Sequence, residues 1–84
     1  MSYSVSILRS AQKSLASVPP VVQDRIVAAI RRLASNPRPP GVKKLTGRDA
    51  WRIRIADYRV IYEIRDATLT ILVVDVGHRR EIYR

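Results

Sequence analysis

The sequence predicts a small α+β protein: a short N-terminal strand and a helical hairpin, then a three-stranded antiparallel meander that completes a sheet packed on the helices. Two observations predict this fold class. Apolar residues recur with a helical period in the first half and with a period of two in the second, and a proline-rich segment separates the halves. With 84 residues, we expect one domain spanning residues 1–84 with a modest core.

The N-terminal half predicts one strand and two helices. Residues 3–8 alternate apolar and polar side chains, which is typical of a short strand. Ser10 can cap the start of a first helix, and Pro19 ends it. Pro20 suits the first turn of a second helix. That helix carries an apolar stripe for the core, formed by Val22, Ile26, Ile30 and Leu33.

The C-terminal half predicts strands. Residues 36–41, NPRPPG, cannot continue a helix, because proline lacks an N–H donor and fixes φ. Beyond this loop, three β-rich runs are separated by short polar breaks, at 51–55, 58–64 and 69–76. Runs this close together predict antiparallel neighbours.

The first break predicts that two arginines face each other. If Ala56 and Asp57 form a two-residue turn, Arg54 lies directly opposite Arg59. Alternation also puts Arg52 on the same face as Arg54. Like charges in opposite positions destabilise a sheet, so this cluster is either well solvated or arranged to bind an anion.

The second break brings the end of the chain to the same place. A two-residue turn at 66–67 would pair Arg59 with Val74. Residues 77–79 would then leave the sheet beside Arg54 and Arg59.

Composition favours a polyanionic partner and argues against metal chemistry. The formal net charge is +9, which suits nucleic acid, an acidic protein or an anionic membrane. Most of the cations are arginines, whose planar guanidinium binds phosphate through two hydrogen bonds. With no cysteine and only His78, we expect no metal and no cofactor. No segment has the length of a membrane span, so we expect a cytoplasmic protein without a membrane partner.

Four motifs resemble those of the RelE/ParE toxin superfamily, and its RelE-like branch in particular. They are KKLTG at 43–47, WRIRI at 51–55, DYRVIYEI at 57–64 and VGHRREIY at 76–83. The resemblance covers nearly the whole chain. It implies the toxin of a type II toxin–antitoxin system, which cleaves mRNA in the ribosomal A site. The implied partners are a cognate acidic antitoxin, in a toxin–antitoxin hetero-oligomer, and the 70S ribosome with its mRNA.

The resemblance also implies site residues. Carried over by motif, the catalytic residues are Arg54, Arg79 and Tyr83, and the phosphate-binding residues are Arg52 and Arg59. We expect Lys43 and Lys44 to add phosphate contacts. Cleavage in this family uses the 2′-hydroxyl of the RNA as nucleophile, without a metal ion.

The proton acceptor is the open question in this site. Well-known members have lysine where this chain has Arg52 and Arg54, and a guanidinium is a poor proton acceptor. The resemblance favours Tyr83 as the base, and His78 is a possible helper, since imidazole exchanges protons near neutral pH.

Simpler readings compete with each of these roles. Arg52 and Arg54 could lie on a solvated sheet face, Arg59 and Arg79 could form ion pairs with nearby acids, and Tyr83 could fray at the chain end. Three aromatic residues are expected to pack in the core rather than stack on bases: Trp51, Tyr58 and Tyr62. As functions, a ParE-like DNA gyrase inhibitor and a non-catalytic RNA-binding module remain alternatives to the nuclease.

Overall fold

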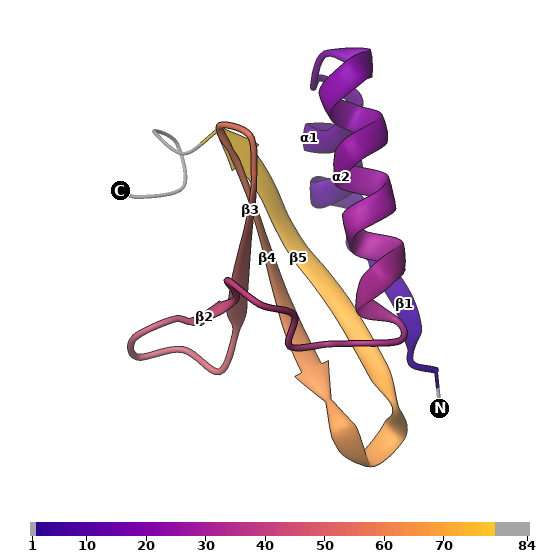
Figure 1. Cartoon of the computed structure of the whole chain (residues 1–84), viewed down its shortest axis with the longest axis vertical. Coiled ribbons are helices and arrows are strands. Elements are labelled where there is room, and N and C mark those ends of the chain that lie inside the picture. The colour runs from indigo at the N-terminus through magenta and orange to yellow at the C-terminus, as the bar shows by residue number, and fades with distance from the viewer. Residues whose placement is uncertain (1, 79–84) are drawn as a thin grey trace.

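The computed structural model describes residues 2–78, which form a five-stranded sheet with two helices against one face (Figure 1). In chain order the elements are β1 (Ser4–Ile7), α1 (Arg9–Ala16), α2 (Pro20–Leu33), β2 (Lys43–Lys44), β3 (Trp51–Ile55), β4 (Tyr58–Arg65), the 3-10 helix η1 (Asp66–Thr68) and β5 (Thr70–His78). The strand order is β1-β5-β4-β3-β2, with β1 parallel to β5 and the other pairs antiparallel. The predicted fold class is confirmed, while β2 is an edge strand that the sequence did not predict.

Contacts with the sheet set the start of α1. Leu8, not Ser10, occupies the N-cap position, and no side chain caps the helix, so the prediction for Ser10 is wrong. The backbone N–H of Leu8 donates to the carbonyl of Val73 on β5 at 2.9 Å, so the chain enters the helix directly from the sheet. Pro20 begins α2 as predicted.

The core lies between the two helices and the inner face of the sheet, and Ala11 of α1 is fully buried in it. Ile26, Ile30 and Leu33 of α2 are buried, which confirms most of the predicted stripe, and Val22 packs at its border. Tyr62 is fully buried on the sheet side, while Trp51 and Tyr58 pack at the edge of the same core. The three aromatic residues therefore serve in packing, as the sequence predicted. No helix within residues 2–78 is long and apolar enough to cross a membrane.

The hairpin between β3 and β4 has the predicted register. Ile55 pairs with Tyr58 across a two-residue turn, and Arg54 lies opposite Arg59. Ala56 in this turn has a φ of +53°, a conformation that is costly for a residue with a Cβ.

The connection between β4 and β5 differs from the prediction. The helix η1 and Leu69, whose φ is +50°, lengthen the turn so that Arg65 pairs with Thr70. A bulge between Ile61 and Tyr62 then shifts the register again. As a result Arg59 pairs with Gly77, and the predicted pairing with Val74 is wrong. Gly77 and His78, which were predicted to leave the sheet, are instead the last two residues of β5, and they lie beside the β3–β4 hairpin as expected.

Candidate nucleic-acid interface

Four cationic side chains gather on the outer face of the sheet, away from the helices. They line a depression of about 310 Å³, which we call the basic hollow, formed by Gly41, Lys43, Arg52, Arg54 and Arg59. The structure thus brings together Lys43 and the three strand arginines that the sequence singled out.

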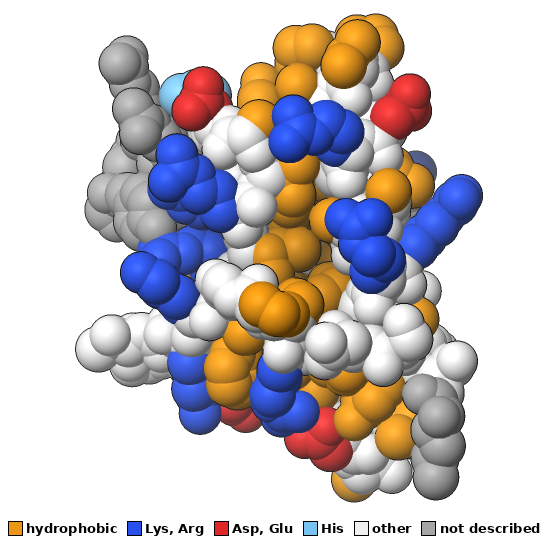
Figure 2. Space-filling model, in the orientation of Figure 1, with side chains coloured by type: hydrophobic (Ala, Val, Ile, Leu, Met, Phe, Trp, Pro, Cys, Tyr) orange, Lys and Arg blue, Asp and Glu red, His pale blue; other side chains and the backbone are white. Residues whose placement is uncertain are grey.

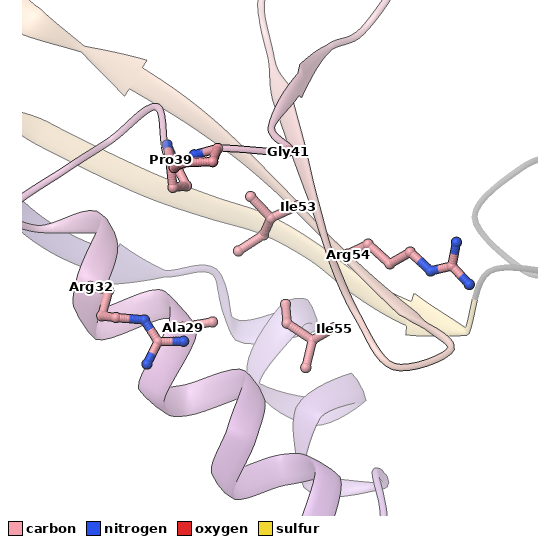
Figure 3. A pocket seen from close by; sticks show the side chains of 8 residues that line it. Ala29, Arg32, Pro39, Gly41, Ile53, Arg54 and Ile55 are labelled. Carbon is pink, nitrogen blue, oxygen red and sulfur yellow. The ribbon is translucent and has the colours of Figure 1, made fainter.

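Strand pairing explains why these side chains meet. Lys43 lies opposite Arg52 across the β2–β3 pair, and Arg54 lies opposite Arg59 across the β3–β4 pair. Since Arg52 and Arg54 are two residues apart on one strand, they share a face. β3 therefore joins two cation pairs into one cluster. The stick view shows Arg54 pointing away from α2, while Ile53 and Ile55 point toward it (Figure 3).

Arg59 is the least exposed cation of the basic hollow. Only 7% of its surface reaches solvent, and Ile61 beside it on β4 is also buried. A charge removed from water interacts more strongly with a nearby opposite charge, because less solvent screens it. None of the residues that line the hollow is acidic. A cluster of this kind can bind an anion through charge-assisted hydrogen bonds.

Arg54 is held at the edge of the basic hollow by its own hairpin. Its Nε donates to the carbonyl oxygen of Ala56 at 3.2 Å, although the side chain remains exposed. This bond leaves the two terminal nitrogens of the guanidinium available for a phosphate, which suits bidentate binding.

Lys44 lies on the opposite side of β2 from the basic hollow. Its ammonium nitrogen lies 5.8 Å from the centre of the Trp51 ring and 3.8 Å from Asp49 Oδ1. The structure therefore separates Lys43 and Lys44, which the sequence had treated alike.

His78 also faces away from the basic hollow. It pairs with Tyr58 across β4 and β5, and the two rings meet edge to face at 5.5 Å. The histidine lines a small hollow on the helix side with Ser14 and Ser17. Arg79 and Tyr83, the other two predicted catalytic residues besides Arg54, lie outside the described residues. Among residues 2–78, no group of three or more His, Cys, Asp or Glu side chains could hold a metal ion.

Gly41 is a site residue that the sequence reasoning did not assign. It ends the proline-rich loop with a φ of +88°, where glycine avoids the strain that a Cβ would bring. The signal was present as the glycine that directly follows Pro39 and Pro40.

A second hollow adjoins the first and is mainly apolar. It has a volume of about 510 Å³ and lies between α2, the proline-rich loop and β3 (Figure 3). Ile53, Ile55 and Ala29 provide its apolar lining, and Arg32 and Arg54 supply charge. Figure 2 shows this arrangement on the surface, where Lys and Arg side chains stand on both sides of an apolar seam.

Comparison with known proteins assigns the chain to a family. The family model described as ParE toxin of type II toxin–antitoxin system, parDE, matches residues 5–83. A curated RelE-like toxin protein of Escherichia coli is 27% identical over 81 residues, which cover 94% of this chain and 85% of the relative.

Solved structures agree with this assignment. A chain of the archaeal RelE–RelB complex from Pyrococcus horikoshii OT3 is 32% identical with a TM-score of 0.85, and the match covers 94% of this chain and 97% of that one. A chain of the toxin–antitoxin complex RelBE2 from Mycobacterium tuberculosis is 27% identical with a TM-score of 0.81, and the match covers 94% of this chain and all of that one (100%). This chain therefore belongs to the ParE toxin family of type II toxin–antitoxin systems, within the RelE/ParE superfamily.

Proposed function

We propose that this toxin is a ribosome-dependent endoribonuclease that stops translation by cleaving mRNA in the ribosomal A site. The observation that carries the proposal is the basic hollow, in which Lys43, Arg52, Arg54 and Arg59 surround one depression. RelE-like relatives support a nuclease-type toxin. In this view the basic hollow holds the phosphate at which the RNA is cut.

The reaction needs a group that accepts a proton, a group that supplies one, and positive charge that stabilises the transition state. The 2′-hydroxyl loses its proton and attacks the adjacent phosphorus, and the bond from phosphorus to the 5′-oxygen breaks as that oxygen gains a proton. The products are a 2′,3′-cyclic phosphate and a 5′-hydroxyl end. Negative charge grows on the non-bridging oxygens in the transition state, and the cations of the basic hollow stabilise that charge.

Proton transfer is assigned to the C-terminal motif. We propose Tyr83 as the base and Arg79 as a further catalytic cation, on the resemblance of VGHRREIY to the family pattern. The orientation of His78 toward Tyr58 supports this choice over His78, because the imidazole lies on the other face of the sheet from the basic hollow.

The cognate partner follows from charge and from the relatives. The two solved relatives described above are chains of toxin–antitoxin complexes. For this chain we propose an acidic antitoxin in a hetero-oligomer, which would neutralise the strand arginines and so block phosphate binding. Its place of action would be the cytoplasm, where ribosomes translate mRNA.

A translation assay tests the nuclease directly. Purified toxin is added to ribosomes that carry a defined mRNA, and primer extension maps new 5′ ends. We expect cuts at the A-site codon with ribosomes and far fewer without them. The double variant R52Q/R54Q should lose cleavage, whereas the matched double variant R31Q/R65Q, which removes two exposed arginines elsewhere, should retain it. Intact mRNA under wild-type toxin would refute the nuclease.

The family match also supports a second candidate, inhibition of DNA gyrase. The matching model describes the ParE toxin of the parDE system, and the RelE-like and ParE-like toxins share this fold. A supercoiling assay with purified gyrase separates the two. Loss of supercoiling together with intact mRNA would show that the toxin inhibits gyrase. RNA binding without any cleavage would favour a non-catalytic RNA-binding module.

A further inference from the structure

Trp51 lies where the proline-rich loop and β2 both return to β3. The centre of its ring lies 5.1 Å from the Arg38 guanidinium carbon and 5.8 Å from the Lys44 ammonium nitrogen. Arg38 belongs to the loop before Gly41, and Lys44 belongs to β2 after it. One indole therefore contacts a cation on each side of the segment that supplies Gly41 and Lys43 to the basic hollow.

Each of the two cations also lies near a carboxylate. Arg38 donates to both oxygens of Asp66, at 3.0 and 3.5 Å, and Asp66 also accepts a 2.6 Å hydrogen bond from the Tyr3 hydroxyl. Lys44 lies 3.8 Å from Asp49. The contacts thus run as a chain from Tyr3, just before β1, and Asp66 of η1, through Trp51, to the loop that follows β2. Its two ends belong to separate parts of the fold.

Apart from Trp51, the segment is held by Val42, which packs against the core, and by a short strand pair. β2 is two residues long, with Lys43 opposite Arg52 and Lys44 opposite Trp51. A pair this short is marginal on its own. Since neighbouring residues of a strand point to opposite faces, holding Lys44 against the indole directs Lys43 to the outer face.

We propose that Trp51 is a positioning residue for the basic hollow: by binding Arg38 and Lys44 on one face of β3, it directs Lys43 to the other. Trp51 does not line the hollow and acts through Lys43. The inference rests on the proposed phosphate-binding role of the hollow, but it does not require that the bound RNA be cleaved.

A double-mutant cycle on RNA affinity tests the proposal. The ligand is a 2′-O-methyl RNA oligonucleotide, which cannot be cut because it lacks the nucleophile. Trp51→Leu removes both cation–π contacts and should weaken binding about three- to tenfold. Lys43→Gln should weaken binding and lower the salt slope by about 0.7, the value for one lost phosphate contact on a single strand. In the Lys43→Gln background, Trp51→Leu should cause little further loss.

Three further variants separate positioning from a general effect on folding or charge. Trp51→Phe keeps an aromatic face and should restore most of the affinity. Arg38→Gln leaves the ring in place and is exposed, so it tests the same contact if Trp51→Leu fails to fold. The matched control is Arg65→Gln, because Arg65 also forms an exposed ion pair, with Glu63 at 2.8 Å. We expect Arg38→Gln to weaken binding by more than Arg65→Gln, and only while Lys43 is present.

The outcomes bear separately on the two proposals. Losses from Trp51→Leu and Lys43→Gln that simply add, or equal losses from Arg38→Gln and Arg65→Gln, would overturn the positioning role. A non-additive cycle in a toxin that leaves ribosome-bound mRNA intact would keep the positioning role and reject the nuclease. Cleavage of ribosome-bound mRNA together with an additive cycle would keep the nuclease and reject the positioning role.

Discussion

Arg54 and Arg59 form a direct cross-strand pair in the hairpin of β3 and β4. Two like charges in such a pair repel, and Arg59 is buried, which weakens the screening by water. An anion bound between the two guanidinium groups would offset this repulsion.

Arg54→Gln should therefore make the protein more stable and less active. Removing one member of the pair relieves repulsion, and we expect the free energy of unfolding to rise by about 0.2–1 kcal/mol in urea titrations. Cleavage in the ribosome assay should fall about a hundredfold, the usual cost of a lost transition-state contact. Arg65→Gln provides the control, with no gain in stability and no loss of cleavage. A destabilised Arg54→Gln protein would contradict this account of the pair.

Asp66 should make stability fall in acid. Its hydrogen bonds from Arg38 and Tyr3 lower the pKa of the carboxyl group in the folded protein. A lowered pKa in the folded state means that the stabilisation is complete above the unfolded pKa of about 4 and is lost as the pH falls through the folded value. The melting temperatures of wild type and Asp66→Asn should therefore differ at neutral pH and converge once the pH is below the folded-state pKa of Asp66. Parallel melting curves at all pH values would exclude this role for the carboxylate.

Tyr62 should dominate the response to alkali. Burial raises the pKa of its phenol to about 12, and the hydroxyl donates to the carbonyl oxygen of Pro37 at 2.7 Å. Because the folded pKa is raised above the unfolded value of about 10, stability is complete below pH 10 and is lost as the pH rises toward 12. Tyr62→Phe should cost about 1 kcal/mol at neutral pH and show a smaller alkaline loss. Urea titrations across this pH range measure both effects, and an unchanged alkaline loss in Tyr62→Phe would assign it to another group.

Ala56→Gly should stabilise the hairpin that carries Arg54 and Arg59. Ala56 has a φ of +53°, and glycine avoids the steric cost of a Cβ there. We expect a gain of about 1 kcal/mol, which for a domain of this size raises the melting temperature by about 4–8 °C. Ala67→Gly, in η1, lacks a positive φ and should give no such gain. Equal effects at the two alanines would show that the strain at Ala56 is negligible.

The site could be predicted wherever short-range rules decided it. A two-residue break with alternating neighbours leaves one natural register, so the pairing of Arg54 with Arg59 followed from the sequence. The partner of Arg59 on β5, by contrast, could not be predicted. A bulge at Ile61 and Tyr62 and a left-handed Leu69 together moved its partner from Val74 to Gly77, and neither feature has a glycine or proline to mark it.

The two lysines show the same limit. Lys43 and Lys44 are adjacent and chemically identical, so the sequence assigned them one role. The structure separates them, because β2 pairs with β3 and alternation then sends one lysine to the basic hollow and the other to Trp51. A two-residue strand has no periodic pattern of its own to reveal this.

The sequence by itself determined the fold class, the helix start at Pro20, the core stripe of α2 and the outward face shared by Arg52 and Arg54. Each of these depends on the period of apolar residues or on proline geometry, which are properties of the local chain. Only the tertiary structure decided the burial of Arg59, the helix-side orientation of His78 and the opposite orientations of Lys43 and Lys44. Those features depend on which strands become neighbours, and strand neighbours are chosen by packing across the whole sheet.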